Sequence, residues 1–256
     1  MIPKIIHYCW LSDDPIPADM QKYINGWKDK LPDYEFILWN FKRFDINSSD
    51  WVKEAFSNKK YAFAADYIRL YALYNYGGIY MDMDVEVLKT FNPFLKLSTM
   101  ICYENGKNGL EMATFGVEKG SPWVKKCLDY YYQRHFIKKD GMFDMVTLPY
   151  LIQNICLKDT YQLVSIKTIS EAIDVKESYM IPVFPSEYFS PKSSFKSEKI
   201  TITNNTISIH HFSGTWLPWY SRFEKKIFNA VGLESPDFIR RVIFKIQLEL
   251  AKRKKV

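Results

Sequence analysis

The sequence lacks the features that mark membrane-spanning, secreted and repeat proteins. It contains no apolar run of about 18 residues, the length that predicts a transmembrane helix. The first residues, Met1 to Ile5, do not resemble a signal peptide, and no internal repeat or low-complexity linker interrupts the chain. We therefore expect a cytoplasmic protein that folds around its own core.

Cysteine is scarce and irregularly spaced. The chain has four cysteines, with no CxxC pair and no zinc-like pattern, at Cys9, Cys102, Cys127 and Cys156. Each stands among apolar residues, which predicts buried free thiols in a reducing compartment. A disulfide framework and a structural zinc site are therefore not expected.

Basic charge is concentrated at one place. The formal net charge is +6, and four positive charges stand close to the end of the chain, at Lys252, Arg253, Lys254 and Lys255. A uniformly basic surface for nucleic acid is therefore not required, and we expect no nucleic-acid partner. The excess remains compatible with anionic substrates or anionic lipid.

Residues 233–256 form a predicted amphipathic, basic C-terminal helix, separate from a main domain over residues 1–232. An apolar stripe at helical spacing runs along it, at Ile239, Val242, Ile243, Ile246 and Leu250. Two interpretations stay open. The segment is either an ordinary packed helix with a solvated charged face, or a peripheral membrane foot on the anionic inner face of the plasma membrane.

The main domain is predicted to be α/β. Apolar strands are expected over residues 4–10 and 34–39 with a helix over 18–30 between them, an order that favours a parallel sheet. A second helix over 61–76 ends at Gly77, because glycine takes the left-handed conformation freely. With 47% hydrophobic residues, the chain can bury a sizeable core.

The strongest chemical signal follows that glycine. A short strand, Ile79-Tyr80-Met81-Asp82, ends in two carboxylates, Asp82 and Asp84, separated by one residue. Ligands of α/β sheets gather at the carboxyl ends of strands, and carboxylates suit hard cations such as Mn²⁺ or Mg²⁺. A cation held there stabilises the charge that grows on a sugar-diphosphate leaving group. An isolated Asp-x-Asp is more often a solvated turn, but the preceding glycines and aromatic strand favour the metal site.

Two further charged residues lie in the predicted helix over 61–76. Asp66 and Arg69 are three residues apart and therefore share one face. They form either a surface ion pair of little energetic weight or, because their neighbours are apolar, a partly buried pair near Asp82. In the second case they are placed to hydrogen-bond hydroxyl groups of a sugar donor.

A third signal lies near residue 210. The segment contains a histidine pair, His210 and His211, followed by Gly214 and Trp216. An imidazole can complete the coordination of Mn²⁺ held by two aspartates. A small residue lets the backbone approach phosphate, and a tryptophan can cover a base or a sugar.

Taken in order, these motifs resemble the signature of glycosyltransferase family 32. The matching segments are His7-Tyr8-Cys9-Trp10, Ala65-Asp66-Tyr67-Ile68-Arg69, Gly77-Gly78-Ile79-Tyr80, Asp82-Met83-Asp84 and His210-His211-Phe212-Ser213-Gly214-Thr215-Trp216. The family includes fungal Golgi mannosyltransferases and bacterial capsule and lipopolysaccharide transferases, and it is similar to the sugar-transferring domains of large clostridial toxins. The resemblance is good over residues 2–96 and 205–219 and weak between them.

The resemblance implies a GT-A fold, which is Rossmann-like and binds a nucleotide sugar, and a transfer that retains the anomeric configuration. It implies that Trp10 stacks on the nucleotide base and that Asp66 and Arg69 contact the donor sugar. It further implies that Asp82 and Asp84 engage ribose and metal. Together these four charged residues are the expected catalytic set.

Further donor contacts are expected from His7, Tyr80, Gly214 and Trp216. For the imidazole ligand, His211 is preferred over His210, because His-x-x-Gly starting at His211 resembles a segment of the related family that contains glycogenin. In that family a lysine follows and binds phosphate. Here Leu217 stands in its place, which leaves the phosphate cation unassigned.

The sequence therefore predicts a metal-dependent, retaining hexosyltransferase. Its donor is expected to be a UDP- or GDP-sugar and its acceptor a glycan or lipid-linked oligosaccharide in capsule or lipopolysaccharide biosynthesis. Candidates for acceptor contacts are Glu104, Asn105, Asp144 and Thr147. Two alternatives remain: a non-catalytic nucleotide- or glycan-binding module of the same fold, and an aspartyl phosphatase, which Glu86 two places after Asp84 disfavours.

Overall fold

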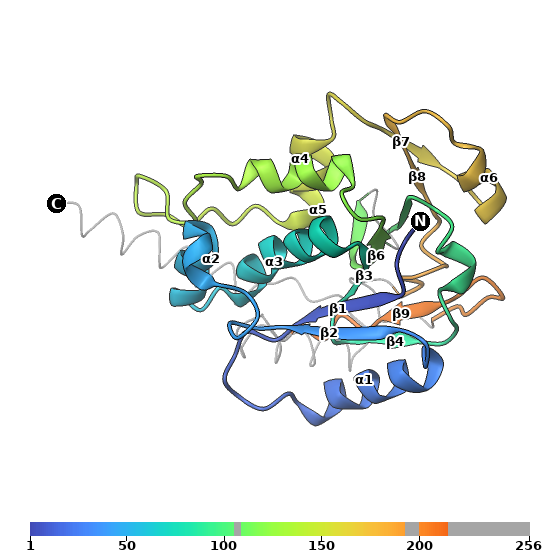
Figure 1. Cartoon of the computed structure of the whole chain (residues 1–256), viewed down its shortest axis with the longest axis horizontal. Coiled ribbons are helices and arrows are strands. Elements are labelled where there is room, and N and C mark those ends of the chain that lie inside the picture. Colours follow the sequence, from blue (N-terminus) through green and yellow to red (C-terminus); the bar gives the residue numbers. More distant parts are fainter. Residues whose placement is uncertain (105–108, 193–199, 215–256) are drawn as a thin grey trace, which may run out of the picture.

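The computed structural model describes residues 1–104, 109–192 and 200–214 (Figure 1). Four predictions of the sequence therefore lie outside the described residues. They concern the helix over 233–256 with its basic cluster, the donor contact of Trp216, the substitution at Leu217 and the acceptor contact of Asn105.

Short helices and strands alternate along the described residues. The first half contains β1 (Ile5–Cys9), α1 (Ala18–Lys30), β2 (Glu35–Trp39), η1 (Ile46–Ser48), α2 (Asp50–Ser57), α3 (Tyr61–Tyr76), β3 (Gly78–Met81), β4 (Val85–Val87), η2 (Asn92–Phe94) and β5 (Thr99–Tyr103). The second contains β6 (Leu110–Val117), α4 (Pro122–Tyr130), α5 (Leu148–Leu151), η3 (Ile152–Cys156), β7 (Gln162–Ser165), α6 (Ile169–Asp174), β8 (Met180–Val183) and β9 (Ser208–His210).

A five-stranded mixed sheet in the order β2-β1-β3-β6-β5 forms the centre. Strand β1 is parallel to both β2 and β3, whereas β6 is antiparallel to β3 and to β5. Helix α1 covers one face, and α3 and α4 lie on the other (Figure 1). The predicted α/β fold is thus confirmed, and this mixed sheet between helical layers is consistent with a GT-A domain.

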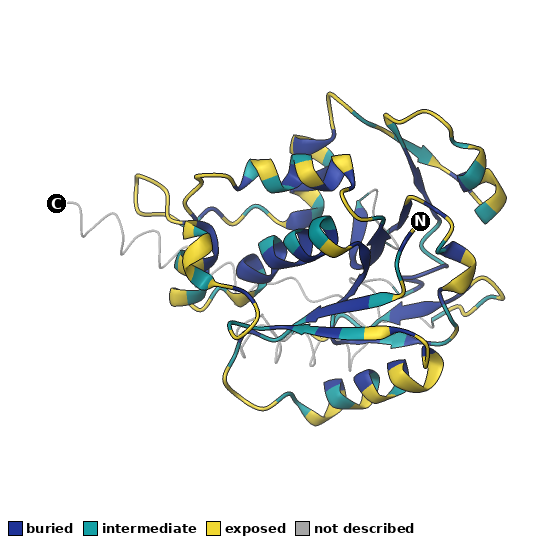
Figure 2. Ribbon diagram, in the orientation of Figure 1, coloured by how far each residue is buried: buried dark blue, intermediate teal, exposed yellow. Residues whose placement is uncertain are grey.

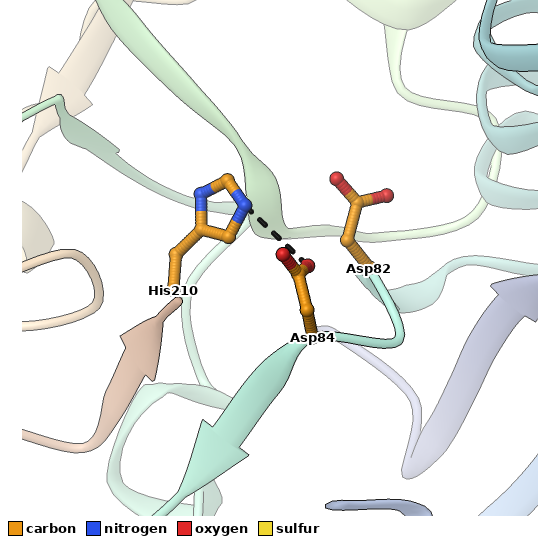
Figure 3. Close-up of side chains that lie close together, drawn as sticks. All are labelled: Asp82, Asp84 and His210. Atoms are coloured by element: carbon orange, nitrogen blue, oxygen red, sulfur yellow. Dashed lines mark ion pairs between the residues drawn. The ribbon is translucent and has the colours of Figure 1, made fainter. Parts of the chain in front are cut away.

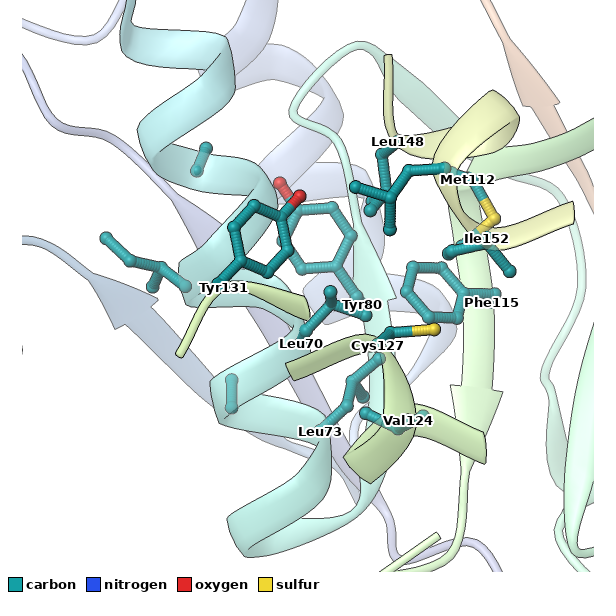
Figure 4. Close-up of a cluster of buried hydrophobic side chains, with 14 of the residues drawn as sticks. Leu70, Leu73, Tyr80, Met112, Phe115, Val124, Cys127, Tyr131, Leu148 and Ile152 are labelled. Carbon is teal, nitrogen blue, oxygen red and sulfur yellow. The ribbon is translucent and has the colours of Figure 1, made fainter. Parts of the chain in front are cut away.

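The two faces of the sheet bury two hydrophobic cores. On the side of α3, Leu70 and Leu73 pack with Tyr80 of β3 and Phe115 of β6 (Figure 4). On the side of α1, the core contains Ile6 of β1 together with Trp27 and Leu31, all three fully buried. Because side chains alternate across a strand, β1 and β3 supply residues to both cores, and Figure 2 shows these strands as buried.

Two small two-stranded sheets lie beside the central one. Strands β7 and β8 pair in parallel, and β4 pairs antiparallel with β9. In the second pair Val85 lies opposite His210 and Val87 opposite Ser208. The indole Nε1 of Trp27 donates to the carbonyl oxygen of Val85 at 2.7 Å, so α1 fixes this pair against the domain.

The connection between α3 and β3 consists of two glycines with positive φ. Gly77 ends α3 at φ +68°, as the sequence predicts, and Gly78 begins β3 at φ +105°. A Cβ on Gly78 would lie 2.6 Å from the carbonyl oxygen of Ile5, so β3 could not approach β1 as closely. The glycine pair therefore sets the strand that delivers the two aspartates. Within the described residues, no helix has the length and apolar character needed to cross a bilayer.

Candidate functional site

The two aspartates of the Asp-x-Asp motif lie in the tight turn between β3 and β4. The turn is closed by the amide of Val85, which donates to the carbonyl oxygen of Asp82 at 3.0 Å. A carboxylate oxygen of Asp82 accepts from the hydroxyl of Tyr80 at 2.9 Å, and one of Asp84 accepts from the amide of Ser213 at 2.7 Å. Both carboxylates are therefore held in place by the surrounding chain.

An imidazole from the other end of the described chain completes the group. The Nε2 atom of His210 lies 3.5 Å from Oδ1 of Asp84. One ligand atom each from Asp82, Asp84 and His210 lie within 4.8 Å of one another, and Figure 3 shows the three side chains converging. We call these three residues the DDH cluster. Two carboxylate oxygens and one imidazole nitrogen fit Mn²⁺ well and Mg²⁺ acceptably.

The structure corrects the preference for His211 over His210. Successive side chains of an extended chain point to opposite sides, so only one of the two histidines can face the aspartates. His211 faces away: its Nε2 lies 2.9 Å from a carboxylate oxygen of Glu86, and its ring stacks on Tyr23 at 4.9 Å between centroids. Only its backbone reaches the turn, where its amide donates to the carbonyl oxygen of Asp84 at 3.0 Å.

Charge is distributed unevenly over the DDH cluster. Burial opposes ionisation of Asp84, but His210 and the amide of Ser213 outweigh it and lower the pKa of Asp84 to about 2. For Asp82 burial prevails over the nearby Arg69 and raises its pKa. Burial lowers the pKa of His210, but Glu111 and Asp84 on either side raise it well above its usual value. Asp84 is therefore an ionised carboxylate at neutral pH, as a metal ligand must be.

Asp66 and Arg69 lie together beside the cluster, as their spacing on α3 predicts. An Arg69 guanidinium nitrogen is 3.2 Å from Asp66 and 3.4 Å from Asp82, and a second donates to the carbonyl oxygen of Met112 at 2.9 Å. Both side chains are about nine-tenths buried, so the surface-pair interpretation is wrong. Burial, offset in part by Arg69, raises the pKa of Asp66 to about 6. Within the described residues Nε of Arg69 is buried without a hydrogen-bond partner.

Tyr80 is a buried residue that contacts two charged side chains of the site. Only 2% of the residue is exposed, and the Arg69 guanidinium carbon lies over its ring at 4.4 Å from the centroid. Its hydroxyl is engaged by Asp82. The direct donor contact expected of Tyr80 is therefore replaced by a supporting role for both charged neighbours.

His7 is also a correction, because it lies in the interior and has no surface for a ligand. Its side chain is fully buried; its Nδ1 accepts from the Trp39 indole at 3.0 Å, and its Nε2 lies 2.8 Å from the carbonyl oxygen of Gly77. Burial lowers its pKa to about 4, so it is a neutral imidazole that donates from Nε2. Instead of touching a donor, His7 ties β1 and β2 to the glycine connection.

Trp10 and Gly214 lie at the edges of the described site. Trp10 directly follows β1, so it shares the carboxyl edge of the parallel strands with Asp82, which directly follows β3. The indole Nε1 of Trp10 donates to the carbonyl oxygen of Asp14 at 2.7 Å, and the residue is only partly buried. Gly214 has φ +60°, a conformation that glycine adopts without strain.

Three of the candidates for acceptor contacts fall within the described residues. Asp144 is buried and lies 3.3 Å from Nε of Arg134, which makes it a structural ion pair. Thr147 is the residue before α5, and Glu104 follows β5, where its amide pairs with Gly109.

One buried charge of the site escaped the sequence reasoning. Glu111 lies in β6 with 4% of its surface exposed, and a carboxylate oxygen is 3.2 Å from Nδ1 of His210. A signal was present, since Glu111 is the only charged residue in the eight-residue apolar strand Leu110–Val117. Alternation along residues 206–210 would also have placed Ser208 and His210 on one face, opposite Ile207 and Ile209.

Residues 17–101 match the family described as the glycosyltransferase sugar-binding region containing a DXD motif. The match includes Asp66, Arg69 and both aspartates of the DDH cluster, and it confirms the resemblance to glycosyltransferase family 32. It ends before His210, so the imidazole of the cluster is a finding of the structure.

Curated relatives of this DXD family share part of the chain. Inositol phosphoceramide mannosyltransferase 3 of Schizosaccharomyces pombe is 32% identical over 130 residues, which is 48% of this chain and 35% of the relative. An uncharacterized glycosyltransferase of Acanthamoeba polyphaga mimivirus is 30% identical over 148 residues, which is 55% of this chain and 58% of the relative. The chain thus spans only a part of each. Likeness to solved structures is weaker: the PaToxG glycosyltransferase aligns with a TM-score of 0.44 and 19% identity over 68% of this chain and 73% of that chain.

Proposed function

We propose that this protein transfers a sugar from a nucleotide-sugar donor to an acceptor hydroxyl, with a divalent cation held by Asp82, Asp84 and His210. The observation that carries the proposal is the DDH cluster at the carboxyl edge of the sheet, together with the match of residues 17–101 to a DXD family. The three ligand atoms suit Mn²⁺ or Mg²⁺, and a bound cation of this kind stabilises the negative charge that develops on the departing diphosphate.

The protein residues contribute positioning and electrostatics. The Tyr80 hydroxyl and the Ser213 amide hold the two aspartates in fixed orientations, so little reorganisation is required when the donor binds. Arg69 lies between Asp66 and Asp82, and its guanidinium is the proposed donor to a hydroxyl of the sugar. Asp66, beside it, suits the same sugar as a hydrogen-bond acceptor.

At the other edge of the site, Trp10 is the proposed platform for the nucleotide base. It lies at the end of β1, one strand away from the aspartates, and is partly exposed. Gly214 is the proposed place where the backbone approaches the diphosphate, because no Cβ stands in the way. We propose front-face substitution with retention of configuration, because we assign no carboxylate of the described residues as a covalent nucleophile.

The acceptor is proposed to be a hydroxyl of a glycan or of a lipid-linked glycan. Relatives named as inositol phosphoceramide mannosyltransferases favour a mannosyl donor and a lipid-borne acceptor. Capsule or lipopolysaccharide synthesis is the proposed setting, with action at the cytoplasmic face of a membrane. Both UDP- and GDP-sugars enter the test below.

The experiment is a turnover assay of the purified chain with UDP- and GDP-sugars, first screened by thermal shift in the presence of Mn²⁺. A donor that binds the folded state raises the unfolding temperature, and its release of nucleoside diphosphate is then measured with an acceptor library. Release that requires Mn²⁺ or Mg²⁺ and stops in excess chelator supports the proposal. Binding without release, under every acceptor tested, would indicate a non-catalytic binding module.

A further inference from the structure

Glu111 is a buried carboxylate whose acceptor sites are filled by three different parts of the chain. One carboxylate oxygen accepts from the amide of Ala113 at 2.8 Å, and the other accepts from the Ser190 hydroxyl at 2.7 Å. The second oxygen also lies 3.2 Å from Nδ1 of His210. Desolvating a carboxylate is costly, so the strand retains this charge against a substantial penalty.

The ring of His210 has one nitrogen toward each carboxylate. Nδ1 faces Glu111 and Nε2 faces Asp84. An ionised carboxylate has no proton to give, so the Nδ1 position must carry the hydrogen in this contact. The Nε2 atom points into the DDH cluster, and its lone pair becomes available to a cation when the imidazolium of the metal-free chain releases its Nε2 proton. Metal-bound histidines generally donate their other ring N–H in this way, and losing that partner lowers metal affinity by about 10–100-fold.

We propose that Glu111 is the positioning residue of the metal site, which fixes the ring orientation and the Nδ1–H tautomer of His210 so that Nε2 can bind the cation. The inference rests on the proposed function, because it presupposes that the DDH cluster holds a metal. It adds a residue outside the matched family segment, on the antiparallel strand β6 and remote in sequence from each of the three ligands.

A purely structural role for Glu111 makes a different prediction. If Glu111 only joins β6, β9 and the loop that contains Ser190, its replacement lowers fold stability without a specific effect on metal binding. Glu111→Gln separates the two roles, because glutamine has the same shape and its oxygen can still accept from the Ala113 amide. Its NH₂ group then faces Nδ1 and donates to it, which drives the ring hydrogen to Nε2, the nitrogen that the cation needs.

The experiment measures Mn²⁺ affinity of the full chain by calorimetry and by EPR, without donor or acceptor. We expect Glu111→Gln to raise the Mn²⁺ dissociation constant by about 10–100-fold. Glu54→Gln is the matched control, because Glu54 also accepts from a histidine ring (His135, 2.6 Å) and a backbone amide (Ile137, 2.9 Å), but on α2, outside the DDH cluster. It should leave the dissociation constant unchanged.

A double-mutant cycle separates positioning from general destabilisation. In a His210→Ala background the tautomer no longer matters, so Glu111→Gln should have no further effect on Mn²⁺ affinity. Wild-type Mn²⁺ affinity in folded Glu111→Gln, or an equal further loss in the His210→Ala background, overturns the proposal. Unfolding curves recorded in chelator show whether each variant is folded.

If Glu111→Gln does not fold, the wild-type protein still decides the question. With Mg²⁺ bound, ¹⁵N NMR of the His210 ring should show a protonated Nδ1 and an unprotonated Nε2, and the reverse assignment overturns the proposal. A wild-type chain that binds no divalent cation refutes the metal site and with it the proposed function. Normal metal binding with an unaffected Glu111→Gln variant refutes only the role of Glu111.

Discussion

Two regions of the molecule each bury a histidine, and the two imidazoles behave in opposite ways. In the interior, His7 contacts an indole N–H and a backbone carbonyl, and burial lowers its pKa to about 4. At the site, His210 lies between Glu111 and Asp84, which outweigh burial and raise its pKa. His7 is therefore a neutral hydrogen-bonding connector, whereas His210 is an element of a charged cluster.

The comparison shows that burial alone does not assign a role to a histidine. Both histidines lie in β-strands, His7 in β1 and His210 in β9, and both were candidates from the sequence. The two histidines differ in their partners. A histidine whose partners are satisfied by a neutral ring is structural, whereas a histidine with a carboxylate at each ring nitrogen is a candidate ligand. The four predictions below test this division, starting with the largest expected effect.

Sugar transfer should be lost when Asp84 of the charged region is replaced. Asp84→Ala removes the ionised carboxylate of the DDH cluster, and a cation stabilises the leaving group by several kcal/mol. We therefore expect a loss of sugar transfer of about 1,000-fold or more, measured as nucleoside diphosphate release. Asp84→Asn should behave likewise, because it keeps the shape and removes the charge.

The control for this prediction is Asp33→Asn, which removes a carboxylate from a surface pair with Lys4 far along the chain from the cluster. It should retain normal transfer. Near-normal turnover by Asp84→Asn, or full wild-type activity in excess chelator, contradicts a metal role for the charged region.

The interior region should lose stability in acid because of His7. Its folded pKa of about 4 lies below the ordinary value of 6.5, so the unfolded chain binds more protons between these pH values. The contribution of His7 to the free energy of unfolding is therefore fully present above about pH 6.5 and is lost as pH falls toward 4, by about 3 kcal/mol in total. Denaturant unfolding across this range measures it.

His7→Gln is the informative variant, because its amide can accept from Trp39 and donate to Gly77 without titrating. Its stability should fall less steeply than that of the wild type over the same pH range. Equal slopes for the two proteins would falsify the description of His7 as a buried neutral imidazole.

Trp10 lies between the two regions, because it directly follows β1 and is three residues beyond His7. If Trp10 belongs to the site, Trp10→Ala should weaken binding of the donor nucleotide by about 1–3 kcal/mol, by analogy with base–aromatic stacking elsewhere. Trp10→Phe should retain part of that affinity. Calorimetry with the free nucleoside diphosphate measures both, and an unchanged affinity in a folded Trp10→Ala protein assigns Trp10 to the core.

The smallest effect is expected for His211, next to the proposed ligand. His211→Gln removes a partly exposed pair with Glu86 and the stack on Tyr23, which together stabilise the fold by about 1 kcal/mol. Mn²⁺ affinity should stay close to that of the wild type, whereas His210→Gln should lower it. The opposite result for the two variants restores the assignment that the sequence alone favoured.

Much of the fold follows from local pattern. The helix over 61–76 and its glycine stop appear in the structure with the same boundaries. Strand Gly78–Met81 is shifted by one residue from the predicted Ile79–Asp82, because Gly78 already pairs with Val117 and Asp82 belongs to the turn. Helix α5 is continued by the wider turns of η3, a change in winding that apolar periodicity does not reveal.

The sequence predicted those parts of the site that are formed by residues close together in the chain. It missed the parts that depend on contacts between distant segments. Spacing alone paired Asp66 with Arg69, and the carboxyl end of β3 located both aspartates. The choice between His210 and His211 depends on the register of β9 against β4, which a motif comparison does not contain. Glu111 depends on the antiparallel placement of β6, and nothing local predicts that placement.

The pairing of β4 with β9 has a consequence for folding. It brings Asp84 into contact with Ser213, which is 129 residues away along the chain. Such non-local contacts form late, because the chain between them must first be ordered. The two aspartates lie in a turn that neighbouring residues can organise early. His210 arrives only when β9 docks. An incompletely folded chain therefore presents two carboxylates without their imidazole, and the complete DDH cluster is a property of the finished fold alone.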